Sequence, residues 1–385
     1  MEVVTGLENE FVIKNNKKLK LGFTTGTCAA AAAKAATIML LTGKSVSAVD
    51  IMTPKGMKLH LPIQDITKSN EYVSCGIKKD SGDDPDVTNG ILVFAKVSKN
   101  SNGVITIDGG TGVGRITKSG LEQPIGSAAI NKIPRQMIHD AVNEICEDND
   151  YVGGVDVEIM IPQGMEIAKK TFNPKLGIVG GISVLGTSGI VEPMSEAALI
   201  ESIRVEVRMR VANGSEYLLI SPGNYGVNFT KEVLSISLEH SIKCSNYIGE
   251  TIDIAVELGV KGILFISHIG KFIKVAGGIM NTHSRFADAR MEIIASNAVK
   301  ASASIETLKA ILNSSTTDEA IGILEEAGLT QETMNYVMER IQYYLSNRGH
   351  DELKLGAIVF SNQYGLLGQT ENTKELIKCL ENYTV

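Results

Sequence analysis

The chain has 385 residues, of which 43% are hydrophobic and 21% charged, a composition typical of a globular protein with apolar material for two cores. Its formal net charge of −7 disfavours a nucleic-acid partner, because phosphate contacts require basic surfaces. The segment up to Glu192 is nearly neutral and could hold an anionic ligand, whereas the remainder is acidic.

The spacing of the cysteines and the length of the apolar run indicate the cellular compartment of the protein. The cysteines are widely spaced and form no CxxC pair, which indicates free thiols in a reducing cytosol. Lys34 interrupts the apolar run that follows Thr27, leaving it at about 14 residues, whereas a membrane-spanning helix needs about 20. We therefore expect a cytoplasmic protein with no membrane segment.

The first part of the chain predicts an α+β domain over residues 1–193. Residues from Thr25 to about Leu41 are strong helix formers that end before Gly43, and a second helix is expected from near Pro134 to about Cys146. Short apolar runs between Gly, Pro, Asp and Asn predict strands: Val46–Met52, Lys58–Leu61, Tyr72–Ile77, Ile91–Val97, Gly103–Asp108 and Val155–Ile161.

The second part predicts an α/β domain over residues 194–385, with a mostly parallel, Rossmann-like sheet. A helix is expected around Ser195–Arg204, another at Gly249–Leu258, a helical insertion at about 300–350, and a last helix from about Asn372. The expected strands are Glu216–Ile220, Ser241–Cys244, Lys261–Ser267 and Leu355–Phe360.

Thr24, Thr25, Gly26 and Thr27 precede Cys28 and an alanine run. Hydroxyls and N–H groups converge at such a helix start, where the helix dipole favours anions, so this segment could hold a carboxylate or phosphate. Local chemistry alone favours a simple N-cap followed by a closely packed helix. Cys28 is expected to be a core residue.

Three further segments of this domain could bind a ligand. The acidic segment Asp80–Asp86 could bind a metal or another cation, could poise a carboxyl group for proton transfer, or could form a solvated turn. The glycines of Gly109–Arg115 do not match GxGxxG spacing, so an anion-binding loop beside Lys118 is a better interpretation than a dinucleotide site. Lys169–Lys175 offers basic and amide donors for a polycarboxylate, or forms a surface turn.

Two loops follow expected parallel strands. They are Gly223–Gly226 and His268–Lys271, and ligands of parallel sheets bind at the carboxyl ends of the strands. His283 could act as an acid or base. A serine hydrolase is not expected, because no GxSxG motif is present.

Together these segments resemble the CbiD family, the cobalt-precorrin-5B C-1 methyltransferases of anaerobic cobalamin biosynthesis. The resemblance rests on matching segments across both expected domains: Leu21–Ala36, Asp83–Gly90, Gly109–Leu121, Ala129–Met137, Ile161–Glu196, Ser221–Gly226, Cys244–Glu250 and Ser267–Asp288. The stretch Ser302–Asp351 is the least similar to the family, and we draw no function from it.

The resemblance implies methyl transfer from S-adenosylmethionine to C-1 of a cobalt-bearing macrocycle. It implies no protein-bound metal, since cobalt arrives in the substrate, and no nucleic-acid or membrane partner; a homo-oligomer is possible. The expected substrate contacts are Thr24, Thr25, Gly26, Thr27, Lys118, Arg135, Lys169 and Asn173. The expected donor contacts are Gly223, Asn224, Gly226, His268 and Gly270.

Proton transfer is expected from Asp83, Asp84 or His283. The alternatives are a non-catalytic corrinoid or tetrapyrrole carrier of the same pathway and, from the glycine loops alone, a nicotinamide-dependent reductase. Binding of S-adenosylmethionine separates the methyltransferase from the carrier, and binding of NADPH would indicate the reductase.

Overall fold

The computed structural model describes residues 5–14, 16–223, 241–350 and 352–381. The chain forms two compact units, unit 1 (Met1–Glu196) and unit 2 (Ala197–Val385). Each unit has its own core of buried aliphatic side chains. We therefore describe them separately.

Unit 1 contains three helices and a series of strands within the described residues. The helices are α1 (Thr25–Thr42), α2 (Lys132–Asp148) and α3 (Gly164–Ala168). The strands are β1 (Phe11–Lys14), β2 (Lys17–Lys20), β3 (Gly22–Phe23), β4 (Ala48–Met52), β5 (Lys58–Lys68), β6 (Tyr72–Lys78), β7 (Leu92–Asn100), β8 (Ile105–Gly109), β9 (Gly112–Val113), β10 (Arg115–Ile116), β11 (Gly154–Met160), β12 (Ile178–Val179), β13 (Gly181–Ile182) and β14 (Ile190–Val191).

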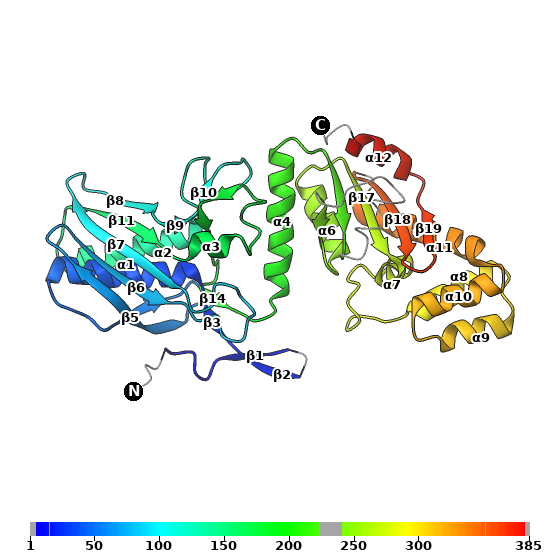
Figure 1. The fold of residues 1–385 in the computed structure, drawn as a ribbon, viewed down its shortest axis with the longest axis horizontal. Coiled ribbons are helices and arrows are strands. Elements are labelled where there is room, and N and C mark those ends of the chain that lie inside the picture. The colour runs from blue at the N-terminus through cyan, green and yellow to red at the C-terminus, as the bar shows by residue number, and fades with distance from the viewer. Residues whose placement is uncertain (1–4, 15, 224–240, 351, 382–385) are drawn as a thin grey trace. The chain divides into compact units, whose positions relative to one another are not determined.

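The core of unit 1 lies between a six-stranded sheet and two helices. The strand order is β4-β5-β6-β7-β11-β8, and only the β11–β8 pair is parallel. Helix α1 packs on β6 and β7, and α2 packs on α1 and β8 (Figure 1). Pairs β10–β12, β9–β13 and β3–β14 add short two-stranded segments beside this sheet.

Helix α1 is the central helix of unit 1. Seven alanines between Ala29 and Ala36 are completely buried, and their small side chains let α1 approach both the sheet and α2. Among the described residues, α1 is the one helix with the length and hydropathy of a membrane span, and 72% of it is buried inside the protein. Its apolar composition therefore fits its position in the core.

Replacing Ala32 by leucine should overpack this interface. The thiol of Cys75 on β6 lies 3.3 Å from the Ala32 carbonyl oxygen, so little room exists for a larger side chain. We expect a loss of about 1–3 kcal/mol in unfolding free energy, measured by urea denaturation. Ala32→Ser is the size-matched control, and an unchanged midpoint for Ala32→Leu would show that the packing is looser than described.

Unit 2 has α4 (Glu196–Ala212) as its first helix, which belongs to this unit from Ala197 onward. Its strands are β15 (Tyr217–Ser221), β16 (Ile242–Lys243), β17 (Gly262–His268), β18 (Lys354–Ser361) and β19 (Gly365–Gln369). Its other helices are α6 (Ile248–Glu257), α7 (Ile269–Phe272), the 3₁₀ helix η1 (Ile273–Gly277), α8 (Arg290–Lys300), α9 (Ile305–Asn313), α10 (Thr317–Glu326), α11 (Thr330–Gly349) and α12 (Thr373–Glu381).

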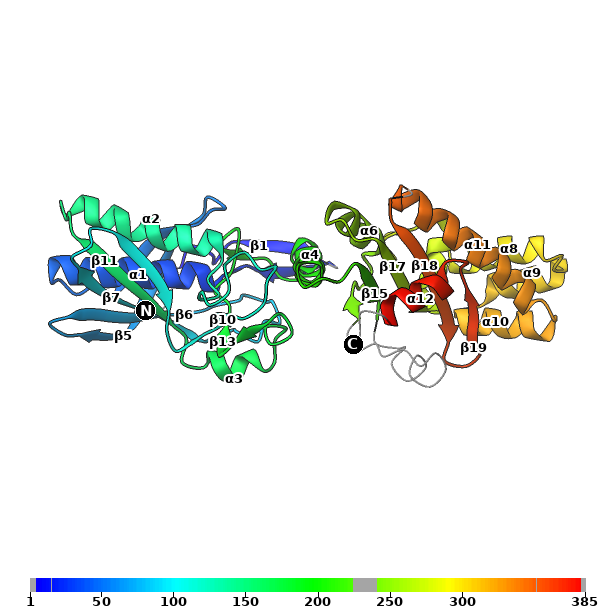
Figure 2. The same ribbon diagram turned by 90° about the horizontal axis from the view of Figure 1, so that it is seen from above.

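The sheet of unit 2 has the order β16-β15-β17-β18-β19. The first four strands are parallel and β19 is antiparallel. Helix α12 packs on one face, and α11 packs on β18 and β19 with α6 beside it (Figure 2). The mixed sheet of unit 1 and the mostly parallel sheet of unit 2 confirm the predicted fold class in this coarse form.

The strand order of unit 2 defines a switch point. In chain order the strands run 2-1-3-4-5, so the connections from β15 and from β17 leave the sheet in opposite directions. A crevice opens at such a point outside the carboxyl ends of the strands, and ligands of this class of sheet bind there. The edge formed by Ser221 and His268 is thus the candidate ligand edge of unit 2.

Candidate functional site

The N-cap and first turn of α1 are engaged within unit 1. Thr24 caps α1 by accepting the Thr27 N–H at 3.2 Å. The Thr25 hydroxyl donates to the Leu185 carbonyl oxygen at 3.2 Å, and the Thr27 hydroxyl donates to that of Gly189 at 2.7 Å. Residues 24–27 are all buried. These groups join α1 to residues 185–189, and a contact with substrate carboxylates stays a prediction.

Cys28 is fully buried, as expected. Burial raises the pKa of its thiol to about 12, and burial raises those of Cys75 and Cys244 to about 12 as well. Thiols with such values are protonated at neutral pH, and only the thiolate is a good nucleophile. None of these three cysteines is therefore suited to covalent catalysis.

Asp83 and Asp84 hold backbone segments. Asp83 accepts the Lys20 N–H at 2.7 Å, and Asp84 accepts the Met194 N–H at 3.1 Å. Met194 has φ 54°, a left-handed conformation that costs energy for a residue with a Cβ. Asp84 thereby helps to fix the backbone just before α4. Proton transfer by either aspartate stays a prediction.

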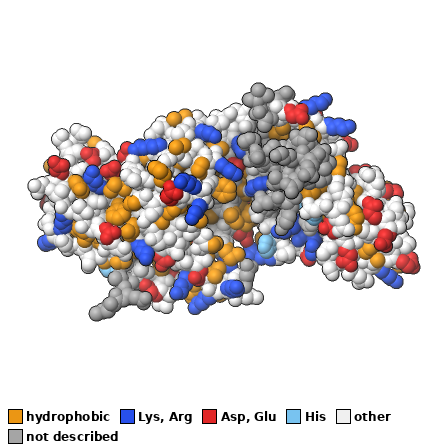
Figure 3. Space-filling view, in the orientation of Figure 1, with side chains coloured by type: hydrophobic (Ala, Val, Ile, Leu, Met, Phe, Trp, Pro, Cys, Tyr) orange, Lys and Arg blue, Asp and Glu red, His pale blue; other side chains and the backbone are white. Residues whose placement is uncertain are grey.

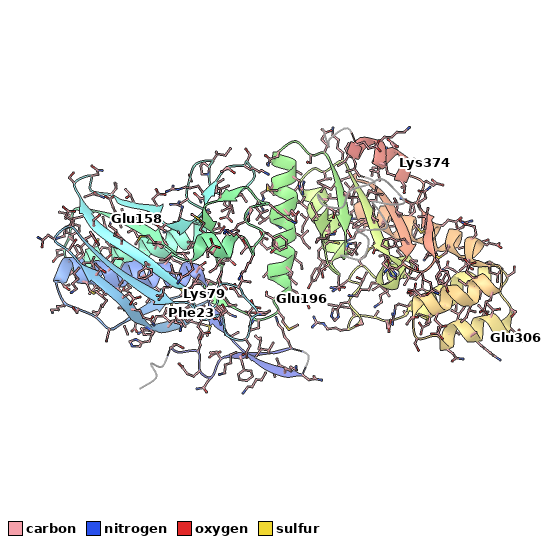
Figure 4. The ribbon with its side chains drawn as sticks, viewed as in Figure 1. Phe23, Lys79, Glu158, Glu196, Glu306 and Lys374 are labelled. Carbon is pink, nitrogen blue, oxygen red and sulfur yellow. The ribbon has the colours of Figure 1, made fainter. Side chains whose placement is uncertain are left out.

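The acidic segment also contains an ion pair that the sequence did not reveal. The Lys79 ammonium lies 2.7 Å from Asp86 and donates to the Ser81 hydroxyl, while its side chain is only 2% exposed. Asp86 additionally accepts the N–H and hydroxyl of Thr88. Lys79 lies at the end of the sheet beside Phe23 (Figure 4). Phe23 donates its N–H to the Asp80 carbonyl, so this pair organises the loop next to β3.

The glycine loop after β8 forms a backbone junction. Gly112 has φ 74°, and a Cβ there would overlap the carbonyl of Ile161. A Cβ on Gly164 or Gly181 would overlap the carbonyl of Gly112. Three glycines therefore let β9, β13 and the start of α3 meet at van der Waals distance. Close backbone packing accounts for these glycines without a bound anion.

A surface that combines basic and apolar side chains lies on α3 and the neighbouring strands. We call it the α3 face; its apolar members are 57–66% exposed. They are Ile125, Met165, Phe172 and Val179, and the exposed lysines are Lys118, Lys169, Lys170 and Lys175. Figure 3 shows such basic and apolar side chains interspersed on the side of unit 1 turned to the viewer.

Contacts within unit 1 bring together the segments that carry the α3 face. Strand β10 pairs with β12, which sets Arg115 opposite Val179, and the Lys118 side chain lies over Gly177. Helix α3 packs on β9 and β13. Lys169 forms an exposed ion pair with Glu166 at 2.8 Å. The backbone of Asn173 accepts the Ile178 N–H at 2.9 Å, which closes the turn before β12.

Arg135 is bound by backbone carbonyls just before α2 and on β8. Its guanidinium donates to the carbonyls of Ile130 (3.0 Å), Ile107 (2.8 Å) and Ala128 (3.3 Å). It is half-buried, and burial is the main reason why its pKa is lowered. The structure thus gives Arg135 a role in joining α2 to β8. A contact between Arg135 and the substrate stays a prediction.

The ligand edge of unit 2 carries Ser221, Lys243, His268 and Ser361 at the ends of four parallel strands. Ser221 donates to the Gly223 carbonyl at 2.8 Å, and so does Lys243 at 3.3 Å. Gly223 is therefore held at this edge. The predicted contacts Asn224 and Gly226 lie outside the described residues.

His268 ends β17 and caps α7. Its Nδ1 accepts the Gly270 N–H at 3.0 Å, so a neutral ring carries its proton on Nε2. Burial is the main cause that lowers the pKa of His268, and Asp318 opposes the shift. The imidazole is consequently neutral at pH 7, with its proton on Nε2. Gly270 contributes its N–H to this cap.

Two carboxylates near this edge were not predicted from the sequence. Asp318, at the start of α10, accepts the Ser361 hydroxyl at 2.7 Å, and its charge acts on His268. Glu250, in the first turn of α6, has a buried Oε2 with no hydrogen-bond partner. A buried acceptor without a donor is costly. These oxygens suit a ligand with cationic or hydroxyl groups.

His283 lies on an exposed loop between η1 and α8. Its Nδ1 accepts the Arg285 N–H at 3.2 Å, and its own N–H donates to the Asn281 side chain at 3.2 Å. The loop is attached to residues near the start of α6, at the same edge as Lys243. In the part of the chain that the structure describes, no three His, Cys, Asp or Glu side chains are grouped to hold a metal.

Comparison with known proteins identifies the family. A model described as CbiD matches residues 12–193, within unit 1, and one described as the CbiD C-terminal domain matches residues 281–371, within unit 2. A cobalt-precorrin-5B C(1)-methyltransferase of Ruminiclostridium cellulolyticum is 49% identical, over 96% of this chain and 98% of its own. The chain belongs to the CbiD family.

Other relatives agree. Enzymes with the same name from Alkaliphilus metalliredigens and Methanocaldococcus jannaschii are 45% and 43% identical, over 97% and 91% of this chain and 98% and 96% of their own. A solved CbiD structure from Archaeoglobus fulgidus is 28% identical, covers 75% of this chain and 88% of its own, and has a TM-score of 0.40. The family models and the curated relatives confirm the resemblance to the CbiD family.

Proposed function

We propose that the chain is a cobalt-precorrin-5B C-1 methyltransferase that uses S-adenosylmethionine. The observation that carries this proposal is the 49% identity to an enzyme of that name over nearly the full length of both chains. The two family models fall into separate units, and the chemistry of the units differs. We assign the macrocycle to unit 1 and the methyl donor to unit 2.

The α3 face suits the macrocycle. A ring-contracted tetrapyrrole has a broad apolar body with carboxylates around its rim. The exposed side chains of Phe172 and Val179 can cover the body, and Lys118, Lys170 and Lys175 can pair with the carboxylates. The Lys169 charge is already balanced by Glu166, so we expect it to contribute less than Lys118.

The carboxyl edge of unit 2 suits the methyl donor. S-adenosylmethionine carries a sulfonium, an ammonium, a carboxylate and two ribose hydroxyls. Asp318 and Glu250 offer oxygens to cationic and hydroxyl groups, and His268 holds the Gly270 N–H at the same edge. The methyl group supplied by this donor is transferred by displacement at carbon, with the sulfur as leaving group. Alignment of the reactants can lower such a barrier by about 7–11 kcal/mol.

An anaerobic assay tests the proposal. The purified chain is incubated with cobalt-precorrin-5B and donor labelled in its methyl group, and the product is analysed by mass spectrometry. We expect one labelled methyl group per macrocycle, located at C-1. Calorimetry with S-adenosylmethionine and its demethylated product should detect binding of both. A chain that binds the macrocycle but neither donor form would instead be a carrier, and this result would contradict the proposal.

Reversing one charge on the α3 face should weaken substrate binding selectively. Lys118→Glu is expected to raise KM for cobalt-precorrin-5B at least tenfold, because a charged hydrogen bond contributes about 1.5–3 kcal/mol. KM for the donor should stay within twofold. Lys44→Glu, at an exposed position beyond the end of α1, is the matched control. Equal changes in both KM values for Lys118→Glu would refute the assignment.

A further inference from the structure

Lys274 is a buried lysine that the proposed chemistry does not use. It lies in η1, and its side chain is 2% exposed. Its ammonium donates to the carbonyl oxygens of Ala287 (2.6 Å) and Thr282 (3.3 Å), and Asp288 lies 3.9 Å away. Both carbonyls belong to the exposed loop between η1 and α8. A single buried charge therefore joins Thr282 and Ala287, near the two ends of that loop.

The same loop, residues 280–289, is attached to the ligand edge of unit 2. The Met280 carbonyl accepts the N–H groups of Ile248 and Gly249 at the start of α6. The Thr282 N–H donates to the Asn246 carbonyl at 3.0 Å, and Asn281 forms a β-bridge with Tyr247. These contacts follow directly after β16. The loop thus covers the first turn of α6, where Glu250 has its unpartnered oxygen.

The far end of the loop is strained. Ala289 has φ 23°, which residues with a Cβ rarely adopt. On either side of it, Asp288 and Arg290 form an ion pair with two hydrogen bonds at 2.5 and 3.1 Å. A strained residue persists only where its surroundings hold it. The contacts that hold it include this ion pair, the bond from Lys274 to Ala287, and the Ile293 N–H, which donates to the Ala289 carbonyl at 3.0 Å.

We propose that Lys274 is a positioning residue that holds the 280–289 loop over the start of α6 and so preforms the methyl-donor site. This inference rests on the proposed function for the donor, but its structural part stands on the contacts of the loop alone. The ammonium has three N–H donors at one point, which can serve both carbonyls and interact with the Asp288 carboxylate. Without it, two loop carbonyls lose a buried partner.

The electrostatic surroundings of Lys274 are consistent with this role. Burial is the main cause that lowers its pKa, while Asp288 raises it and Arg290 and Lys271 lower it further. The charge is kept because carbonyl oxygens replace the water that solvated it. Lys271 itself donates to the Asn246 side chain at 3.0 Å. Because Asn246 also accepts the Thr282 N–H, Lys271 stabilises the attachment of the loop at Thr282.

The test uses the full chain and a fluorescent reporter. The chain contains no tryptophan, so Phe286→Trp, at a loop position that is 54% exposed, adds a single emitter. In this background Lys274→Ala is compared with Lys309→Ala, which changes an exposed lysine on α9. The readouts are tryptophan anisotropy, the rate of trypsin cleavage after Arg285, and the donor Kd from calorimetry.

We expect Lys274→Ala to lower the anisotropy, to speed cleavage after Arg285 at least tenfold, and to raise the donor Kd about tenfold. Addition of n-propylammonium, which can occupy the vacated space, should partly reverse all three changes. Lys309→Ala should change none of them. Unchanged anisotropy and cleavage in a folded Lys274→Ala variant would overturn the inference, as would a donor Kd within twofold of the parent.

Two further measurements distinguish misfolding of the variant from failure of the inference. Should Lys274→Ala not fold, Lys274→Met preserves the apolar stem and is measured in the same way. In the parent chain, hydrogen exchange of the Thr282 N–H must be slow; fast exchange would overturn the inference without any variant. If the parent chain does not bind the donor at all, the proposed function fails, whereas anisotropy and cleavage still decide the role of Lys274.

Discussion

Replacing Lys79 by methionine is expected to destabilise unit 1 by about 3 kcal/mol, because removing one partner of a buried ion pair leaves the other charge uncompensated. The side chains of Lys79 and Asp86 are 2% and 26% exposed. For a unit of this size the midpoint of thermal unfolding should fall by about 6–12 °C. Calorimetry or circular dichroism measures the change.

The dependence of stability on pH tests whether Asp86 causes this loss. Burial alone would raise the pKa of Asp86, but the charge and hydrogen bond of Lys79 and the bonds from Thr88 outweigh it, so the pKa is lowered from 3.8. The carboxylate of the parent chain therefore stabilises the fold above pH 3.8, and this contribution is lost as pH falls through the lowered value. Without Lys79, we expect burial, the largest of these contributions, to outweigh the bonds from Thr88 and to raise the pKa of Asp86.

The stability difference between parent and Lys79→Met should consequently shrink as the pH is lowered from 7 toward 4, because protonation removes the buried charge of the variant. The double variant Lys79→Met/Asp86→Leu is the control. It replaces both charges and should recover most of the loss. A constant difference across this pH range would mean that Asp86 is not the source of the destabilisation.

Replacing Gly112 by alanine should be comparably harmful. The new Cβ would occupy a left-handed conformation, which costs about 1–2 kcal/mol, and would overlap the Ile161 carbonyl, which adds about 1–3 kcal/mol for overpacking. Because Gly112 supports α3, we also expect a higher KM for cobalt-precorrin-5B. Urea denaturation and steady-state kinetics measure the two effects.

Gly180 offers a matched control for this substitution. It also has a positive φ, 85°, but a Cβ there would meet nothing within 4 Å. Gly180→Ala should therefore cost only the conformational part, about 1–2 kcal/mol. The difference between the two variants isolates the steric overlap at the glycine junction. Equal losses would show that the backbone around Gly112 relaxes.

Elements with a clear pattern were predictable from the sequence. The helix beginning at Thr25 follows from its alanines and from Gly43, which ends it in a left-handed conformation. The apolar run at 262–268 forms the central strand β17 as expected. The two-residue strands β9, β10, β12 and β13 were missed, because pairing with distant backbone defines them and no local periodicity does.

The candidate site was predictable only in part. Residues that follow parallel strands, such as His268, could be assigned to an edge because topology alone sets that position. Lys274 and Asp318 could not, since their importance depends on burial and on partners far along the chain. Thr25 and Thr27 were singled out from the sequence as expected ligand contacts. The sequence could not show that their hydroxyls donate to carbonyl oxygens about 160 residues away.

Those threonine contacts have a consequence for the order of folding during synthesis. Helix α1 is made early, but its N-terminal hydroxyls are satisfied by Leu185 and Gly189, and β3 pairs with β14 at Ile190. Contacts of such large sequence separation slow folding. A nascent chain therefore carries an apolar helix that cannot dock completely until residue 191 has left the ribosome, and this interval is when chaperones matter most for the protein.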